Sequence, residues 1–306
     1  MPSPARVNHS ARALPAPVIL QSGRQRLSVL PDLGGSIAAW DWQQDDRWTA
    51  LFRPWDGRSR DLYSTACFPL VPWSNRITDG GFEAAGSQQA ISPNRSGEIY
   101  PIHGDGWLQA WQITMQSDDR LTLELHSDQF DGNPYRYHAK QLLTLRDNAL
   151  ELELRVANTG RQTLPFGLGL HPYFPRDAET RLQFRSRGVW LCGADPIPTG
   201  FTQELPPGWD YNRAAPVDGA LIDNCYEGWD GIALIDYPQH KLRLHMHTQD
   251  RSGYTLLYRP PGLDYFCLEP ITHPIDAFHM PGRPGLIDLA PGADMVLLTR
   301  FSVSEL

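Results

Sequence analysis

Two short motifs in the sequence could carry acid–base chemistry. In GLGLHPYF an apolar run ends at His171, and in FCLEPITHP an apolar run ends at Glu269; a proline follows each of them directly. Imidazole gives or takes a proton near neutral pH. A carboxylate that is partly removed from water has a raised pKa and becomes a better base near pH 7. The two residues could therefore act as a proton donor and a proton acceptor.

Each of these residues, taken alone, has an ordinary structural interpretation that is favoured. His171 could be a core histidine bonded to a backbone carbonyl, and Glu269 could be an exposed glutamate in a salt bridge. Because Pro270 has no N–H to give to a strand ladder, we expect the strand to stop there. Glu269 should then lie near the end of a sheet, close to apolar neighbours.

Four further polar residues lie in turn-rich segments and could bind a ligand rich in hydroxyl groups. Arg76, next to Asn75 in PWSNRITDGGF, has donors that suit a hydroxyl pair, a carboxylate or a phosphate; the alternative is a surface ion pair with Asp79. His103 in IHGDGW could be a second donor or an exposed loop histidine. Asp223 in LIDNCYEGWDG could accept hydrogen bonds from hydroxyl groups or simply form a turn.

Other kinds of site find little support in the sequence. The segments DLGGSIAAW and IHGDGW lack the lysine–serine pair of a phosphate loop, and neither G-x-S-x-G nor H-E-x-x-H occurs. His245 and His247 share one face of an expected strand and could suggest a metal. No cysteine or carboxylate cluster lies near them in the sequence, so we expect a solvated polar face and no metal site.

The elements that must position these residues are predicted to be strands. Apolar and polar residues alternate with a period of two, which is typical of antiparallel sheets with one buried face. Glycine (26) and proline (27) occur too often for long helices. We expect an all-β fold, a large antiparallel β-sandwich forming one domain over 1–306, with 1–16 as a loose tail. The clearest strand segments are 120–127, 141–159 with a turn at Asp147-Asn148, 241–248, 264–270 and 294–303.

Composition narrows the class of protein. The chain has 306 residues, 41% of them hydrophobic and 20% charged, so it can bury a full core. Its net charge of -8 argues against nucleic acid or an anionic membrane as the main partner. No window approaches the roughly 18 apolar residues that span a bilayer. The four cysteines are far apart and form no C-x-x-C pair, so we expect free thiols and a cytoplasmic protein. The oligomeric state stays open between a monomer and a homodimer.

The motifs together resemble a known family. PWSNRITDGGF, IHGDGW, GLGLHPYF, DNCYEGW and CLEPITHP occur in the same order as motifs of the aldose 1-epimerase (galactose mutarotase) family, and the similarity runs from GGSIAAWDW to the C-terminal strands. The resemblance implies a galactose mutarotase-type sandwich and a small-molecule sugar substrate. It also implies interconversion of the α and β anomers of an aldohexose by acid–base ring opening, without metal or cofactor.

The resemblance also implies roles for individual residues. Glu269 matches the general base and His171 the general acid. Four residues match substrate-binding positions: Arg76, His103, Asp223 and, more weakly, Asn75.

Two departures from the family pattern leave the sugar open. The loop reads HGDGW where a glycine doublet is more usual after the histidine, and Pro175-Arg176 follows HPYF. An anionic hexose, a 6-phosphate or a sulfosugar, is therefore an alternative substrate, with Arg76, Arg176 or Arg259 as its anion-binding residue. A non-catalytic carbohydrate-binding protein on the same fold is a further alternative. One or two tryptophans are expected to stack on the sugar, with Trp73, Trp107 and Trp229 inside the motifs.

Overall fold

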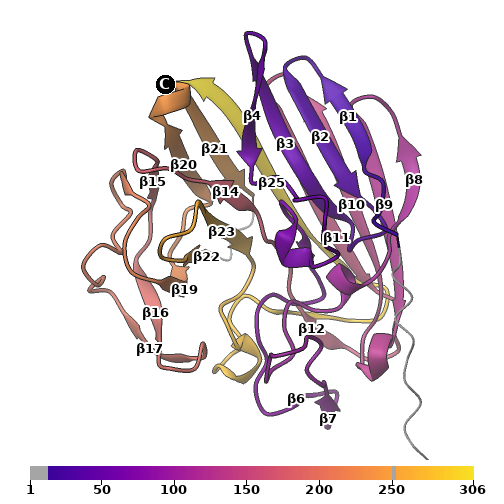
Figure 1. Cartoon of the computed structure of the whole chain (residues 1–306). Coiled ribbons are helices and arrows are strands. Elements are labelled where there is room, and N and C mark those ends of the chain that lie inside the picture. The colour runs from indigo at the N-terminus through magenta and orange to yellow at the C-terminus, as the bar shows by residue number, and fades with distance from the viewer. Residues whose placement is uncertain (1–12, 250–252) are drawn as a thin grey trace, which may run out of the picture.

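The computed structural model describes residues 13–249 and 253–306, and its regular structure is almost entirely β (Figure 1). The helices of this part of the chain are single turns of 3-10 helix: η1 (Leu62–Ser64), η2 (Gly106–Leu108), η3 (Phe130–Gly132), η4 (Pro238–His240) and η5 (Ala277–His279). The described residues contain no helix long and apolar enough to cross a membrane. Residues 13–17 precede the first strand; the remainder of the expected N-terminal tail lies outside the described residues.

One layer of the molecule is a nine-stranded antiparallel sheet. In spatial order its strands are β18 (Ala215–Pro216), β15 (Arg181–Phe184), β20 (Ile232–Tyr237), β21 (Leu242–Thr248), β25 (Asp294–Glu305), β11 (Ala149–Asn158), β10 (Arg136–Arg146), β9 (Arg120–Asp128) and β8 (Gln112–Gln116). The four strands predicted within 120–127, 141–159 and 241–248 are present, and β25 covers the fifth predicted segment, 294–303. The predicted turn is also confirmed: β10 and β11 pair up to Arg146 and Ala149 around the two residues Asp147-Asn148.

A second sheet carries two of the predicted site residues, Asp223 on β19 (Ile222–Glu227) and Glu269 on β23 (Tyr265–Ile271). Its order is β17 (Pro198–Thr202), β16 (Gly188–Cys192), β19, β22 (Tyr254–Arg259), β23, β13 (Gly169–Leu170) and β5 (Pro69–Leu70), with β14 (Tyr173–Pro175) also paired to β23. A four-stranded sheet consists of β1 (Val18–Ser22), β2 (Gln25–Leu30), β3 (Ser36–Gln44) and β4 (Arg47–Phe52). Two ribbons complete the fold: β6 (Gly81–Ala84) with β7 (Ser87–Ala90), and β12 (Leu164–Phe166) with β24 (Ile287–Leu289).

Aromatic side chains join the layers in the core. Phe52 of β4 packs edge-to-face on Phe301 of β25 and on Phe174 of β14, with ring centroids 5.1 and 5.4 Å apart. All three rings are buried. Such pairs contribute about 0.5–1.5 kcal/mol each beyond the burial of their area. These contacts bring strands from all three sheets together and confirm the predicted large antiparallel sandwich.

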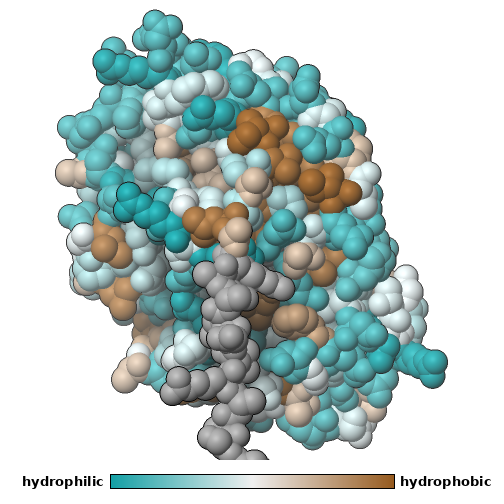
Figure 2. All heavy atoms as spheres, turned by 45° about the vertical axis from the view of Figure 1, so that its right-hand side comes forward, coloured by the Kyte–Doolittle hydropathy of each residue, from teal (hydrophilic) through white to brown (hydrophobic). Residues whose placement is uncertain are grey.

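The outer surface follows from the same alternation. Strand β21 shows it clearly, since Leu242, Leu244 and Met246 are buried while His247 is exposed. On the face shown in Figure 2, hydrophilic side chains predominate and the apolar areas are separate patches. Isolated apolar side chains at the surface are ordinary for a folded domain.

The expectation that Pro270 ends its strand is wrong. β23 continues to Ile271, which pairs with Tyr254 on one side and Gly169 on the other. The missing N–H of Pro270 removes one donor, but flanking pairs on both edges keep the strand in the sheet. Glu269 still lies near the end of β23 and among buried neighbours, as expected, because the residues from Phe266 to Ile271 are all buried.

Candidate active site

All six predicted site residues line one cavity. Its volume is about 320 Å³, within the range of about 300–1,000 Å³ that is usual for small-molecule sites. The walls come from β19, β22, β23, the β13–β14 segment and the three loops that follow β4, β5 and β7. The lining residues are Tyr63, Asn75, Arg76, Arg95, Glu98, Ile102, His103, His171, Tyr173, Asp223, Leu256, Tyr258, Tyr265 and Glu269.

His171 and Glu269 meet directly in this cavity. The distance from His171 Nε2 to Glu269 Oε1 is 3.3 Å, and the two side chains are only 8% and 2% exposed. His171 lies between β13 and β14, where its N–H donates to the carbonyl of Phe68. Its ring stacks on both Phe68 and Tyr173, with centroid distances of 4.6 and 4.8 Å. The two aromatic rings fix the imidazole plane so that Nε2 faces the carboxyl group.

Burial shifts the two groups in opposite directions. It lowers the pKa of His171 to about 3, assisted by the nearby charge of Arg53. Burial also raises the pKa of Glu269 well above its ordinary value; Asp223 adds to this rise, and Arg76 opposes it. Both shifts favour the uncharged forms, so between the lowered pKa of His171 and the raised pKa of Glu269 the pair holds one titratable proton, on the carboxyl group. Such a pair titrates as a unit.

Asn75 and His103 both have a left-handed backbone conformation, which the sequence did not predict. Both have positive φ angles, 55° and 61°, which are uncommon for residues other than glycine. The backbone N–H of Asn75 donates to His103 Nδ1 at 3.1 Å. This acceptor role leaves the proton on Nε2, and burial lowers the pKa of His103 well below its ordinary value. His103 is therefore a neutral donor at the cavity.

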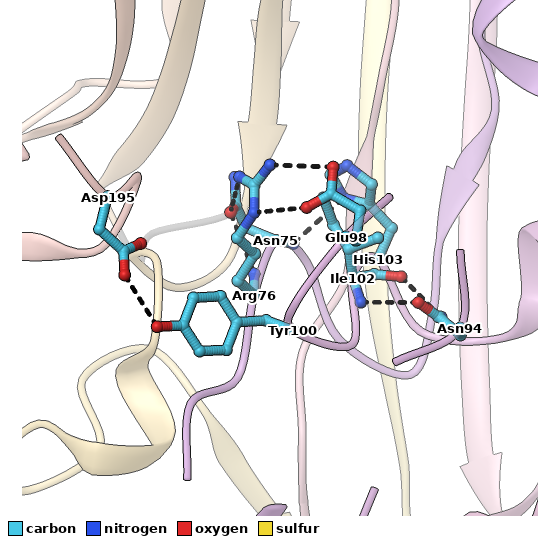
Figure 3. A network of polar contacts seen from close by, with 8 residues as sticks. All are labelled: Asn75, Arg76, Asn94, Glu98, Tyr100, Ile102, His103 and Asp195. Carbon is cyan, nitrogen blue, oxygen red and sulfur yellow. Dashed lines mark hydrogen bonds and ion pairs between the residues drawn. The ribbon is translucent and has the colours of Figure 1, made fainter. Parts of the chain in front are cut away.

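Arg76 makes its ion pair with Glu98. Its Nε and Nη2 donate to the two carboxylate oxygens of Glu98 at 3.1 and 3.3 Å, and Nη1 donates to Asn75 Oδ1 at 3.3 Å (Figure 3). The alternative partner considered from the sequence, Asp79, is wrong: its side chain is 81% exposed and lies 4.0 Å from His279.

Asp223 approaches the cavity from β19, where it pairs with Tyr258 of β22. Burial raises its pKa, and the charge of Arg76 lowers it. No residue in the described chain donates a hydrogen bond to its carboxylate. The carboxylate can therefore accept hydrogen bonds from a ligand.

The aromatic walls of the cavity are tyrosines, and the expectation of a stacking tryptophan is wrong. Trp73, Trp107 and Trp229 are between 1% and 6% exposed and contribute nothing to the described cavity lining. Trp107 instead lies behind Tyr63, with the rings stacked 5.6 Å apart. A tryptophan inside a sequence motif can either stack on a sugar or pack in the core, and these three are buried in the core.

Two arginines considered as anion-binding residues are used in the scaffold. Arg176 donates to the carbonyls of Leu263, Val217 and Pro260. Arg259 donates to the carbonyls of Ala220 and Gly208 and to the hydroxyl of Tyr211. Because these backbone contacts occupy both guanidinium groups, neither arginine lines the cavity.

Metal-ligating side chains meet elsewhere in the described structure. Glu124, His126 and His138 bring potential ligand atoms within 4.8 Å of one another on β9 and β10, in the nine-stranded sheet, and none of the three lines the cavity. His245, by contrast, contacts Ser304 at 3.1 Å, in keeping with the polar face expected for it. The four cysteines are free, as predicted, and three of them are buried.

Eight of the fourteen described lining residues were not predicted as site residues, and three of these, Tyr63, Arg95 and Glu98, bring polar or charged groups from loops. They lie on loops whose polar, proline- and glycine-containing composition indicates only a turn. Arg95 places its guanidinium 3.7 Å from the centre of the Tyr63 ring and 3.6 Å from Asp61. No local pattern could have shown that these loops fold back over the sheet.

Comparison with known proteins agrees with the geometry. Residues 18–302 match the family model described as aldose 1-epimerase. The "Uncharacterized protein YphB" of Escherichia coli K12 is 36% identical over 281 residues, covering 89% of this chain and 93% of that protein. The crystal structure of a "Putative aldose 1-epimerase" from Escherichia coli K12 has a TM-score of 0.89 at 33% identity, covering 95% of this chain and 99% of that one.

A more distant structure shares the fold. The GalM/aldose epimerase homologue from C. elegans has a TM-score of 0.78 at 15% identity and covers 95% of this chain and 100% of its own. The match of the family model over nearly the whole chain is decisive for the family. The chain belongs to the aldose 1-epimerase family.

Proposed function

We propose that the protein interconverts the α and β anomers of an uncharged aldohexose by opening and reclosing the sugar ring. The contact between His171 and Glu269, 3.3 Å apart in a cavity of about 320 Å³, carries this proposal. Mutarotation needs one group that accepts a proton and one that donates it. A buried pair that shares one proton supplies both, whichever member holds the proton at rest.

The reaction balances without any added reagent. Glu269, as the carboxylate, takes the proton of the C1 hydroxyl while His171, as the imidazolium, protonates the ring oxygen and the C1–O5 bond breaks. The aldehyde rotates about C1–C2, and the roles reverse as the ring closes on its other face. Burial favours the proton on Glu269 in the empty site, so the reactive arrangement requires one proton transfer across the short contact. No net proton is consumed, and no cofactor is needed.

The remaining polar residues are proposed to bind the sugar. Arg76 and the Nε2–H of neutral His103 can donate hydrogen bonds and stabilise negative charge that develops on oxygen. Asp223 can accept hydrogen bonds from sugar hydroxyl groups in the cavity. Asn75 contributes by accepting from Arg76 rather than by a demonstrated reach toward the ligand.

The charges of the cavity favour an uncharged sugar. The lining contains two arginines and three carboxyl groups, and Glu98 directly neutralises Arg76. Arg95 is the residue that favours the alternative, an anionic hexose, because its contact with the half-exposed Asp61 is loose. Hexose 6-phosphate and a sulfonated hexose therefore belong in the same assay.

Exchange spectroscopy by NMR tests this function. Anomer exchange is measured for glucose, galactose, glucose 6-phosphate and a sulfonated hexose, with buffer alone as the reference rate. We expect exchange above the buffer rate for at least one neutral sugar and its loss in Glu269→Gln and in His171→Asn. Sugar binding without exchange would instead support the non-catalytic carbohydrate-binding alternative.

A further inference from the structure

Glu98 lines the cavity and accepts two hydrogen bonds from Arg76, and the proposed acid–base chemistry does not explain this contact. We propose that Glu98 is a positioning residue that fixes the Arg76 guanidinium for the sugar and cancels its charge, so that the cavity binds a neutral ligand in preference to an anion. This inference rests on the proposed function for its kinetic consequence. Its electrostatic consequence can be measured without any turnover.

The loop that carries Glu98 is closed by hydrogen bonds between its own ends and is tied to a distant segment of the chain. The Asn94 side chain donates to the carbonyls of Ile102 and Gly104 at 2.8 and 2.7 Å and accepts from the N–H of Ile102 at 2.9 Å. At the other end of the loop, the hydroxyl of Tyr100 donates to Asp195 at 2.8 Å (Figure 3). These contacts fix the loop over the sheet, and Glu98 approaches Arg76 from it.

Glu98 binds the edge of the Arg76 guanidinium group that carries Nε and Nη2. Nε and Nη2 bind the two carboxylate oxygens, and Nη1 binds Asn75. Three of the five N–H donors that a guanidinium carries are thus occupied, which leaves one donor on each Nη for a ligand. The two carboxylate bonds prevent rotation of the guanidinium plane, so the free donors keep one direction.

The same contact controls charge. The side chains of Arg76 and Glu98 are 12% and 20% exposed, so solvent screens them only partly. Without a carboxylate partner, an arginine that lines a cavity would attract phosphate and sulfate, which can bind a guanidinium group through two hydrogen bonds. With Glu98 beside it, the pair carries no net charge, and an anion would face the repulsion of the carboxylate. A neutral hydroxyl group loses little from this arrangement because it needs only the direction of the free donors.

Glu98→Gln separates these two effects because it keeps the shape and removes the charge. We expect kcat/KM for the neutral aldose to fall about tenfold, the equivalent of one hydrogen bond to a charged group. Glu98→Asp keeps the charge and should retain more activity than Glu98→Gln. Glu179→Gln alters an exposed glutamate outside the cavity and serves as the matched control, with unchanged kinetics.

Titration with inorganic phosphate, followed by calorimetry, measures the charge effect directly. We expect Glu98→Gln to bind phosphate about tenfold more tightly than the parent, since a guanidinium–phosphate pair is no longer opposed by a carboxylate. The gain should disappear in the double variant Glu98→Gln/Arg76→Met. Thermal unfolding of each variant is recorded in parallel to detect a loss of fold.

The outcomes are distinct. Weaker turnover together with tighter phosphate binding that depends on Arg76 supports the inference. Turnover and phosphate affinity equal to those of the parent overturn it, as does a parallel loss of activity and thermal stability without any gain for phosphate, which marks a merely structural contact. If the parent catalyses no exchange, the proposed function fails, whereas the phosphate titration still decides the role of Glu98.

Discussion

Glu269→Gln should lower activity and raise stability at the same time. The substitution keeps the shape of the side chain but removes a proton acceptor that the proposed reaction requires. Positioned acid–base groups contribute roughly 10²–10⁴-fold in rate, so exchange should fall by at least about a hundredfold. The stability effect follows from burial: Glu269 is 1% exposed, and its Oε2 has no hydrogen-bond partner in the described structure.

The sign of the stability change follows from ionisation, and its size from linkage. Glutamine leaves a buried polar atom unpaired just as glutamic acid does, at about 1–3 kcal/mol in either case, but it avoids the cost of ionisation, which grows by up to about 1.4 kcal/mol per pH unit above the ordinary pKa. Because burial raises the pKa of Glu269 in the folded state, the folded protein holds a proton that the unfolded chain releases above its ordinary pKa. The contribution of Glu269 to the free energy of unfolding is therefore fully present below the ordinary pKa of glutamate and is lost as the pH rises toward the raised pKa of the folded state. The advantage of Glu269→Gln over the parent should therefore grow between pH 5 and pH 8.

Thermal unfolding at several pH values, with NMR exchange on the same samples, checks this prediction. Glu179→Gln serves again as the control, since an exposed glutamate should change neither property. A variant that exchanges anomers at the parental rate would refute the base assignment. A variant that is less stable than the parent at every pH would refute the argument that the carboxyl group is held at a cost to folding.

The remaining predictions concern the rest of the site. The rate of exchange should be highest at intermediate pH and fall on both sides, because the His171–Glu269 pair must hold one proton; a rate that is flat from pH 4 to pH 10 would contradict the shared-proton model. Asp223→Asn should raise KM about tenfold and change kcat much less, because the proposed role of Asp223 is to accept hydrogen bonds from the sugar hydroxyl groups; saturation kinetics measures both constants. Gly104→Ala should lower the free energy of unfolding by about 3 kcal/mol or more, because φ is +69° and the added Cβ would lie 2.1 Å from the carbonyl oxygen of Val71; chemical denaturation measures it, and a wild-type value would refute this reading of the loop. Dialysis against EDTA should leave exchange unchanged, and loss of activity that added metal restores would show that the side chains alone do not suffice.

The strands were predictable because their signal is local. Alternation in β21 and the turn at Asp147-Asn148 follow from the residues themselves, since a period of two places alternate side chains on opposite faces. The same reasoning failed at Pro270. A rule about one missing N–H cannot show that neighbouring pairs on both edges continue the strand.

The candidate acid–base residues, His171 and Glu269, also came from local motifs, but their environment did not. The tyrosine walls, the pairing of Arg76 with Glu98 and the scaffold role of Arg176 depend on segments that lie far apart in the chain. Such contacts leave no periodic trace in the sequence.

The sequence alone determined which residue types are available and which segments form strands, because proton chemistry and side-chain alternation belong to single residues and their neighbours. Only the tertiary structure decided that His171 and Glu269 share a buried contact, since strands brought together from distant parts of the chain exclude water there. Exclusion of water shifts both pKa values and so gives this pair of ordinary residues its capacity to exchange one proton.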